Sequence, residues 1–488
     1  MTLSDRHTTK QRDIEWSRRL TEVYPGAVVN KSLGLRHEVS QLPRFVSEWL
    51  IGKFCETGDT RENLAEMDAY VHAHYVERKQ KNVALHRLEQ QGQIKLIDAY
   101  QVRVDLSKPE DERYKLEIPS LGLFNAKVQR HIIDSHPRML VDGVWGMGQL
   151  LYNGETREVI LTRFRPFQLS NVDLAAFQEG RTYFTTEEWQ KILISSTGLN
   201  PDAYPVEVRL HIISRMVPLV EKNAHMIELG PPGTGKTYLF DKVSVYSRVI
   251  SGSVVSPAVL FYNIRDKTPG LLAYYDAVVF DEVDKVGRGM KDEVVNKLLK
   301  FMADGSYDRG DVEIPSPASV VLVGNLPAFD QDYEDVPCFE LLPPIMQHKA
   351  FLDRLAGFLP GWKIGKIGQR QEHLTPYNGF AADYFCEILH LLRTLNFQNY
   401  IDQYVSLDNA NIRDEKGVKA VASGLLKLLF PDGEFQPGEV ATCVKHAIGY
   451  RQRVLDQRYL LYRDPQDKKR LGFKLLSNQS FSRLGKDS

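Results

Sequence analysis

The chain has 488 residues, of which 43% are hydrophobic and 26% are charged. These proportions are typical of a globular protein, and a prior of about 150 residues per domain suggests about three domains. The longest apolar runs, Ala277 to Phe280 and Ser319 to Val323, are far shorter than the roughly 20 residues of a membrane-spanning helix, so we expect no membrane partner. The opening stretch from Met1 to Arg12 lacks the apolar segment of a secretory signal, and the expected location is the cytoplasm.

The formal net charge is -1, and the four cysteines form no C-x-x-C pair. A nearly neutral chain attracts nucleic acid only where Lys and Arg are clustered locally. The scattered cysteines argue against a zinc ribbon, a redox motif and a secreted disulfide framework, so we expect buried thiols.

Residues 1–170 divide into two predicted modules. Apolar residues at helical spacing, among them Phe45, Trp49 and Phe54, predict a helical module over residues 1–91. Over residues 92–170 the pattern changes to short alternating strands and turns, including Asn153-Gly154. It predicts a β-rich module of about the size of an OB-fold, which is a candidate DNA-binding domain.

The remaining residues predict an α/β core framed by helices. A capping-box-like start at Thr185 to Glu188 lies in a predicted helical linker, residues 171–220. Short apolar strands alternate with helices over residues 221–375, which indicates a parallel α/β sheet. Residues 376–465 are predicted to form an α-helical lid, and residues 466–488 a polar tail.

A phosphate-binding loop of the form G-x-x-x-x-G-K-[ST] follows the apolar strand His225 to Leu229. Its residues are Gly230, Pro231, Pro232, Gly233, Thr234, Gly235, Lys236 and Thr237. Glycines let backbone amides surround phosphates, Lys236 reaches the β- and γ-phosphates, and the Thr237 hydroxyl holds Mg²⁺. A plain glycine-rich turn is the alternative, which the flanking strand and helix disfavour. The sequence contains no N-K-x-D guanine motif, so ATP is expected rather than GTP.

Two further strand ends carry polar residues. The apolar run Ala277 to Phe280 ends at Asp281-Glu282, where the aspartate would order Mg²⁺ and the glutamate would polarise the attacking water. The run Ser319 to Val323 ends near Asn325, which could orient the same water. The alternatives are an ordinary strand end and an asparagine that makes a turn.

Two arginines are candidates for contacts with the γ-phosphate. Arg354 would act as an arginine finger across a subunit boundary, or it would pair with Asp353 or Asp383 in a surface salt bridge. Arg413 would contact the phosphate from the lid, or it would lie on a solvated helix face.

The order of these motifs along the chain resembles that of AAA+ ATPases: the phosphate-binding loop, Asp281-Glu282, Asn325, Arg354 and Arg413. The resemblance implies the roles of Walker A, Walker B, sensor 1, arginine finger and sensor 2. It also implies a P-loop α/β core with a helical lid and assembly into a homo-oligomeric ring, expected to be a hexamer or stacked hexamers.

Other stretches resemble the Lon-related BrxL family of bacterial BREX phage-defence systems. They are Gln41 to Leu50, Phe184 to Trp189, Val220 to Asn223, Leu260 to Asn263, Leu359 to Trp362 and Val421 to Phe430. The resemblance runs from about Val29 to Tyr462 and implies a ring on DNA, with other BREX proteins as further candidate partners. Since about two dozen residues follow Tyr462, we expect a short or truncated member without the protease-like domain.

Several basic residues are candidates for DNA contact. The resemblance implies that Gly305 to Gly310, which contains Arg309, belongs to a pore-facing hairpin, the alternative being a plain connection. Arg163 and Arg165 flank Phe164, and the run Arg451 to Arg463 interleaves arginines with tyrosines. Each could follow a phosphate backbone or simply face solvent.

The sequence therefore predicts an ATP hydrolase that forms rings and moves on or remodels double-stranded DNA in phage defence. Two alternatives remain open. One is a Lon-like unfoldase that threads polypeptide, and the other is a DNA-encircling scaffold whose assembly is set by ATP.

Overall fold

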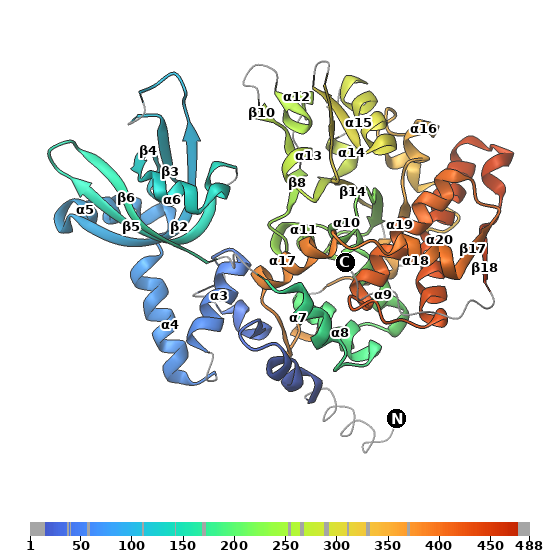
Figure 1. Cartoon of the computed structure of the whole chain (residues 1–488), viewed down its shortest axis with the longest axis horizontal. Helices are drawn as coiled ribbons and strands as arrows, with labels where there is room; N and C mark the ends of the chain where they lie inside the picture. The colour runs from blue at the N-terminus through green and yellow to red at the C-terminus, as the bar shows by residue number, and fades with distance from the viewer. Residues whose placement is uncertain are drawn as a thin grey trace. The chain divides into compact units, whose positions relative to one another are not determined.

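The computed structural model describes residues 15–36, 39, 41–55, 59–109, 112–141, 143–167, 172–251, 255–263, 268–286, 292–309, 312–327, 332–367 and 371–476. The chain forms two compact units (Figure 1). Unit 1 comprises Met1–Asp173, Ser195–Asn200 and Leu374–Glu387, and unit 2 comprises Leu174–Ile194, Pro201–His373 and Ile388–Ser488. Within the described residues, no helix is both long and apolar enough to cross a lipid bilayer.

A closed barrel of five strands forms one part of unit 1. Its strands are β2 (Gln93–Val104), β3 (Tyr114–Ile118), β4 (Leu123–Val128), β5 (Val144–Asn153) and β6 (Glu158–Pro166). Their order around the barrel is β2-β3-β4-β6-β5, with β4 and β6 parallel and the other pairs antiparallel. Alternate residues such as Leu96, Leu116 and Leu150 point inward and are fully buried, as the period of a strand requires.

Helices pack with this barrel to complete unit 1. They are α3 (Arg44–Phe54), α4 (Arg61–His74), α5 (Lys81–Gln91) and α6 (Arg130–Ser135). Thr60 caps α4 by accepting a hydrogen bond from the Asn63 amide at 3.2 Å, as a residue of this type commonly does. Directly after α4, a parallel bridge between Tyr75 and Ile97 joins the helical segment to β2.

Unit 2 is built on a parallel sheet of five strands. The strands are β7 (Met226–Gly230), β8 (Ser247–Ser251), β11 (Ala277–Asp281), β14 (Ser319–Asn325) and β15 (Gly357–Pro360), in the order β15-β7-β14-β11-β8. Ala277 to Phe280 are fully buried, which explains their unbroken apolar run, because helices cover both faces of a parallel sheet. The expectation of a parallel α/β sheet in this region is confirmed.

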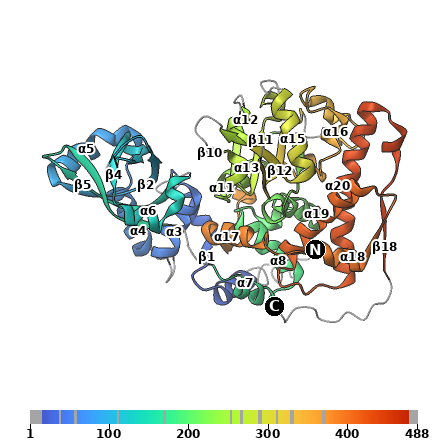
Figure 2. The same cartoon turned by 45° about the horizontal axis from the view of Figure 1, so that its top comes forward.

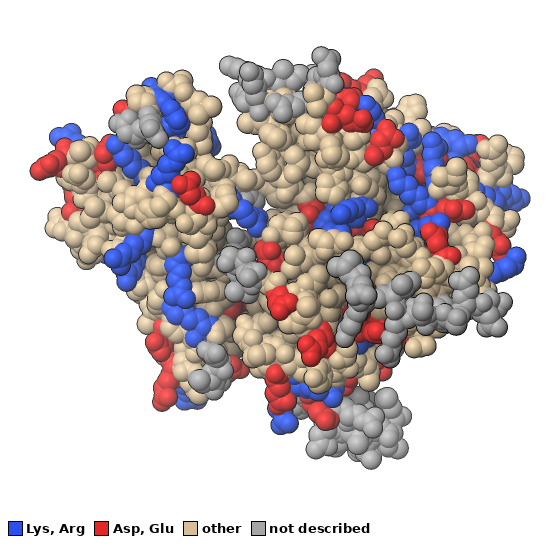
Figure 3. Space-filling view, in the orientation of Figure 1, with Lys and Arg blue, Asp and Glu red and all other residues tan. Residues whose placement is uncertain are grey.

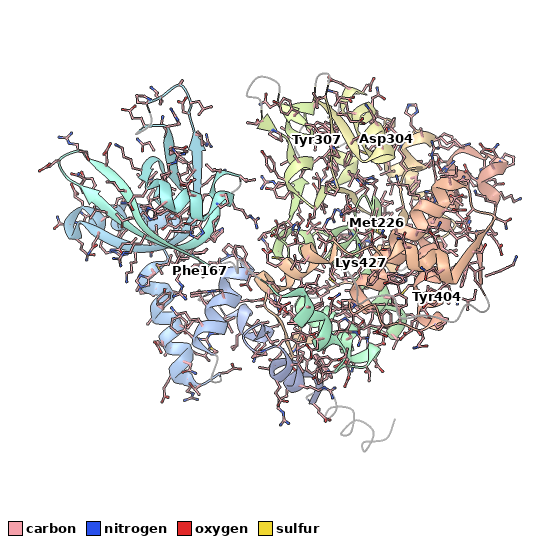
Figure 4. The ribbon with its side chains drawn as sticks, viewed as in Figure 1. Phe167, Met226, Asp304, Tyr307, Tyr404 and Lys427 are labelled. Atoms are coloured by element: carbon pink, nitrogen blue, oxygen red, sulfur yellow. The ribbon has the colours of Figure 1, made fainter. Side chains whose placement is uncertain are left out.

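Helices and short hairpins surround this sheet (Figure 2). Before and between the strands lie α7 (Leu174–Arg181), α8 (Thr186–Ser196), α9 (Val206–Ser214), α10 (Val217–Val220), α11 (Tyr238–Lys242), α12 (Pro257–Leu260), α13 (Leu271–Tyr274), α14 (Val283–Val286), α15 (Asp292–Asp304) and α16 (Lys349–Leu352). Helix α15 buries Leu298 and Phe301 against sheet residues such as Phe280 and Leu322. Strands β9 (Tyr262–Asn263) and β10 (Thr268–Pro269) form a two-stranded antiparallel pair. A second antiparallel pair, the hairpin of β12 (Ser306–Arg309) and β13 (Val312–Pro315), follows α15. Figure 4 labels Asp304, at the end of α15, and Tyr307, in β12. Because β12 pairs with β13, this segment is a hairpin and not a plain connection.

The C-terminal part of the described chain is mainly helical. It contains α17 (Ala382–Leu392), α18 (Gln398–Tyr404), α19 (Ile412–Leu429) and α20 (Pro437–Tyr462). Helix α19 begins with a capping box, in which the Asn411 side chain accepts from the Asp414 amide and the Asp414 carboxylate accepts from the Asn411 amide. Three of the four cysteines are buried and Cys55 is half-buried, and all four are free thiols.

Three features differ from the sequence prediction because strands pair across long sequence separations. Strand β1 (Val28–Asn30) lies inside the predicted helical module and pairs with β16 (Asn378–Phe380). Residues Leu374–Glu387 therefore belong to unit 1, although the predicted lid begins at residue 376. Strand β18 (Gly472–Leu475) lies in the predicted polar tail and pairs with β17 (Val405–Asp408).

Candidate active site

Three strands of unit 2 bring their carboxyl ends to one edge of the sheet. The phosphate-binding loop begins at the end of β7, Asp281 ends β11, and Asn325 ends β14. Strand β14 lies between the other two strands, and Asn325 is in register with Gly230. Since neighbouring strands are about 4.8 Å apart, the loop, the amide and the carboxylates lie side by side. The sheet thus brings together the residues that were predicted as Walker A, Walker B and sensor 1.

The loop needs glycine at several positions. Gly233 and Gly235 have φ angles of +84° and +72°, where other residues are strained. A side chain at Gly235 would place its Cβ 2.6 Å from Cδ1 of Ile367, and one at Gly230 would meet the Gly361 backbone at 2.6 Å. The Ile367 amide also donates to the Gly233 carbonyl at 2.8 Å. Residues 361–367 therefore lie against the loop, a contact that the sequence motif does not contain.

Lys236 is a buried cation inside this loop. Its Nζ donates to the carbonyl oxygens of Gly230 at 2.8 Å and Pro231 at 2.7 Å. Burial lowers the pKa of Lys236 to about 8, although the charges of Glu228 and Asp281 oppose this. Among the described residues no carboxylate forms an ion pair with Lys236. A buried ammonium with only neutral acceptors fits an anionic ligand, and the glycine turns leave backbone amides free of side-chain bulk.

The rest of the loop leads into a short helix. Thr234 is fully buried and its hydroxyl donates to the Pro231 carbonyl at 3.4 Å, whereas Pro232 is exposed. Thr237 stands at the start of α11, which has five residues. Its half-buried hydroxyl lies on the same edge as Asp281, so the two could hold Mg²⁺, for which oxygen ligands are suited.

Glu282 follows Asp281 in a left-handed backbone conformation, with φ of 50°. The Asp281 carboxylate accepts the Glu282 amide hydrogen at 2.9 Å, which holds this turn. A non-glycine residue in this region costs of order 1 to 2 kcal/mol, and such strain is concentrated at functional sites. The Glu282 carboxylate accepts from Lys285 Nζ at 2.8 Å. Sequence reasoning missed Lys285, although the i,i+3 spacing from Glu282, which directly precedes α14, could have indicated the pair.

Asn325 is exposed at the tip of β14. Within the part of the chain that the structure describes, its side chain has no hydrogen-bond partner. An asparagine that makes a turn would bond to nearby backbone, so that alternative lacks support here. Its amide is free to hold a water molecule.

Arg354 and Arg413 lie at the opposite edge of the same sheet. The Ala356 amide donates to the His225 carbonyl at 2.7 Å, just before β15 and β7 begin, and Arg354 precedes that point. Strand β7 has five residues, which at about 3.3 Å per step separate the two edges by roughly 13 Å. Arg413 was expected to contact a phosphate from the lid, but at this distance it cannot reach a phosphate that is held by the loop of its own chain.

Asp353 holds this arginine cluster together. Its buried carboxylate accepts from Arg413, from Arg458 and, at 3.1 Å, from Arg451. Burial alone would raise the pKa of Asp353, but Arg458, Arg413 and Arg451 lower it below its usual value. Sequence reasoning missed this role because the three arginines are distant in the chain.

Arg354 itself is left without a carboxylate. Burial and the charge of Arg413 lower the pKa of Arg354, and its Nε has no hydrogen-bond partner in the structure. In the described ranges Arg354 forms no ion pair, so the predicted alternative of a salt bridge with Asp353 is not found. The half-buried guanidinium donates through Nη1 to the Ala350 carbonyl, and because it has no carboxylate partner in the described residues it can still bind an anionic group outside this chain.

The predicted DNA contacts lie elsewhere. Arg163 and Arg165 are exposed on β6 and point to the same side of the barrel. Arg309 ends β12, and its side chain lies outside the described residues. The expectation that the run Arg451 to Arg463 could follow a phosphate backbone is wrong for two of its arginines, because Arg451 and Arg458 are buried in ion pairs. Arg453 is paired with Glu334, and Arg463 is exposed.

Two protein families match the chain. An N-terminal family, described as "BREX system Lon protease-like protein BrxL N-terminal", matches residues 22–152. A second family, described as "Lon-like protease BrxL-like, ATPase domain", matches residues 159–466 and therefore includes the whole site described above.

Two curated relatives cover most of the chain. A protein from Bacillus cereus (strain H3081.97) named "Lon-like protease BrxL" is 33% identical over 90% of this chain. A protein of the same name from Escherichia coli O9:H4 (strain HS) is 32% identical over 90%. The matches cover 66% and 64% of the relatives' own lengths, so the chain spans about two thirds of each.

Proposed function

Because the chain belongs to the BrxL family and carries its ATPase domain, we propose that it hydrolyses ATP with Mg²⁺ as a ring of identical subunits around double-stranded DNA. In this proposal the ring moves along or remodels the duplex in phage defence, with α18 to α20 as its helical lid. The ring is a hexamer or a stack of hexamers.

One observation carries the proposal: the site residues lie at two opposite edges of one sheet. Lys236 and Glu282 lie at the carboxyl edge, while Arg354 and Arg413 lie at the amino edge. A single subunit cannot bring both sets to one phosphate across roughly 13 Å of strand. If the amino edge of one subunit faces the carboxyl edge of the next, every interface completes one site. A closed ring repeats such a head-to-tail contact without leaving an end.

At the carboxyl edge each residue has a separate task. Lys236 neutralises phosphate charge and the loop amides orient it, while Thr237 and Asp281 hold Mg²⁺, which supplies further charge neutralisation when bound. The Glu282 carboxylate accepts the proton of the attacking water, and Asn325 orients that water. In the described structure Lys285 contacts Oε1 of Glu282, so the second carboxylate oxygen is left for the proton of the water.

The DNA part of the proposal depends on local charge. A chain of net charge -1 needs its cations gathered on one surface, and Arg163 and Arg165 are exposed on the same face of β6. The strand order of the barrel supports an OB-like module, a fold that commonly binds nucleic acid. A ring would repeat these few charges, together with Arg309, once per subunit.

ATP hydrolysis and DNA binding should therefore depend on each other. Duplex binding, measured by gel shift at several salt concentrations, is expected to need ATP and to fall steeply with salt. Duplex DNA should also stimulate hydrolysis. Stimulation by unfolded polypeptide, without duplex binding at low salt, would favour the unfoldase instead. Duplex retention with ATP but slow turnover would favour the scaffold.

A further inference from the structure

A basic groove lies in unit 1 between the helices α3 and α4 and the face of the barrel. It is a hollow of about 390 Å³ whose lining includes Trp49, Tyr70, His74, Lys95, Arg163 and Arg165. Figure 4 labels Phe167, which also lines it, where the chain leaves β6. Figure 3 shows Lys and Arg side chains over the junction of α4 with the barrel.

The barrel arranges part of this lining in rows. Lys95 of β2, Gln149 of β5 and Arg163 of β6 are direct cross-strand neighbours. Arg165 pairs with Met147 in the next row on the same face. Because residues two apart on a strand share a face, the cations stand on one continuous surface.

The groove is positive throughout the part that the structure describes. A second hollow of about 290 Å³ shares His74, Lys95 and Gln149 and adds Arg87, and neither lining contains an acidic residue. By contrast, a third hollow on the barrel mixes Arg103 and Lys115 with acidic Asp105 and Glu117.

The cations in and beside the groove lack ion-pair partners among the described residues. Across the described ranges, no carboxylate forms an ion pair with Lys53, Arg87, Lys95, Arg163 or Arg165. Burial, and then the charge of Lys95, Arg87 and Lys53, lower the pKa of His74 despite a hydrogen bond with the Lys95 backbone. Repulsion among several unpaired cations on one surface is relieved when a polyanion binds them.

One end of the groove is aromatic. The ring centroids of Trp49 and Phe167 are 4.3 Å apart. The Lys53 Nζ lies 4.3 Å from the Tyr70 ring centroid and 5.4 Å from that of Trp49, and the Arg165 guanidinium lies 5.7 Å from Trp49. Burial and the charge of Arg165 lower the pKa of Lys53, while Glu66 opposes the shift. Aromatic faces beside cations are the features that bind a base and its phosphate together.

We propose that the basic groove binds one unpaired nucleic-acid strand, with phosphates along Arg163, Lys95 and Arg87 and a base against Trp49 and Tyr70. This proposal rests on the proposed function, since it gives the separated strand of a remodelled duplex a place on each subunit. The ring offers Arg163 and Arg165 to the phosphates of the duplex, and after strand separation the same side chains would contact those of the unpaired strand. Only the unpaired strand also has free base faces for Trp49 and Tyr70, because the bases of a duplex are already stacked on one another.

The first experiment measures binding of a fluorescent single-stranded oligonucleotide to the full chain by anisotropy, without ATP and at several salt concentrations. Replacing Lys95 and Arg163 by Glu should weaken binding and reduce the slope of log affinity against log salt by about 1.4, or about 0.7 per lost phosphate contact. The matched control is Lys115→Glu, a barrel lysine in the hollow of mixed charge, which should leave both quantities nearly unchanged. Thermal unfolding shows that each variant is folded.

The second experiment tests the base contact. An oligonucleotide with abasic sites should bind the unaltered protein about 5- to 150-fold more weakly, and Tyr70→Leu should reduce that difference. Equal single-strand binding by the double variant and the control would overturn the proposal. The proposal would also be overturned if an acidic peptide displaced the labelled oligonucleotide as well as unlabelled oligonucleotide does, and if the double variant lost binding of that peptide.

The two proposals can fail separately. If the unaltered protein shows no ATP-dependent duplex binding, the proposed function fails, whatever the oligonucleotide result. If the unaltered protein binds duplex DNA and hydrolyses ATP as proposed, while the double variant still binds single strands normally, only the groove assignment fails.

Discussion

The two edges of the parallel sheet in unit 2 hold their charges in opposite ways. At the carboxyl edge, Lys236 has only carbonyl partners and Asn325 has no hydrogen-bond partner among the described residues. At the amino edge, Asp353 accepts from three arginines, and Asp414 binds Arg451 and Lys469. The first edge leaves the charge of Lys236 for a substrate, whereas the second fixes all of these charges within the chain.

The dense pairing at the amino edge has a consequence for Arg354. Arg451 donates to the backbone carbonyls of Asp353 and Leu355, on either side of Arg354. The backbone is thus held from helix α20, while the Arg354 side chain stays without an ion pair in the described structure. A rigid backbone, with a guanidinium whose hydrogen bond in the described structure goes to the neutral Ala350 carbonyl, is an arrangement that suits a trans-acting arginine.

The largest loss should come from the carboxyl edge, with Lys236→Ala. Deleting the one buried, unpaired cation of the loop removes the charge that balances the phosphates, so ATP affinity should fall by roughly 100-fold or more and hydrolysis should be lost. Calorimetric titration with ATP measures this. Lys242→Ala, which removes an exposed lysine of α11, is the control and should bind normally.

Arg354→Ala tests whether the amino edge serves a neighbouring subunit. A trans finger contributes about 1,000-fold or more to hydrolysis, so this variant should bind ATP but hydrolyse it very slowly. Mixed rings with Lys236→Ala subunits should regain part of the rate, because Lys236→Ala subunits still offer Arg354. Arg470→Ala, at an exposed arginine, should hydrolyse normally. No recovery at any mixing ratio, with ring assembly verified, would contradict a shared site.

Glu282→Gln separates binding from chemistry at the carboxyl edge. The loop stays intact, so ATP should bind, but hydrolysis should fall by about 100- to 10,000-fold because no carboxylate accepts the proton. Phosphate release in single turnover measures the rate. Glu293→Gln, on the exposed face of α15, should hydrolyse normally. An unchanged rate in Glu282→Gln would remove its assignment as the base.

Asp353→Asn should affect stability more than ATP affinity. Removing one charge from a buried ion-pair network leaves the arginines uncompensated and costs about 3 to 5 kcal/mol. A urea titration that follows unit 2 measures the free energy of unfolding. Asp408→Asn, which breaks the exposed pair with Lys474, should cost less than about 1 kcal/mol. Equal effects of the two substitutions would mean that the Asp353 cluster has no special structural role.

The effect that is smallest at neutral pH concerns two histidines of unit 2, of which His225 is buried and His211 is half-buried. Burial lowers the pKa values of His225 and His211 to about 3, and the His225 ring accepts the Val320 amide hydrogen at 3.0 Å. The unfolded chain binds protons near pH 6.5 but the folded chain does not, so stability should fall as the pH drops from about 6.5 toward 3. The slope is up to about 1.4 kcal/mol per pH unit for each histidine. His225→Asn should reduce this dependence of the free energy of unfolding on pH, as measured by acid unfolding curves. Replacing the exposed His348 should leave it unchanged.

The sequence by itself determined the carboxyl edge. The loop from Gly230 to Thr237 is one local segment, and Asp281 and Asn325 each end an apolar run. In a parallel sheet the carboxyl ends of strands meet at one edge, so these local signals were enough to place the residues together. The motifs could be recognised because their chemistry needs fixed spacings within a few residues.

Only the tertiary structure decided the amino edge and the groove. Arg413, Arg451 and Arg458 reach Asp353 from 60, 98 and 105 residues away, and β1 pairs with β16 across most of the chain. The row of Lys95, Gln149 and Arg163 depends on the register of three strands, and a shift of one residue would turn it to the other face. Such contacts follow no local period, because packing brings together side chains whose separation along the chain carries no signal.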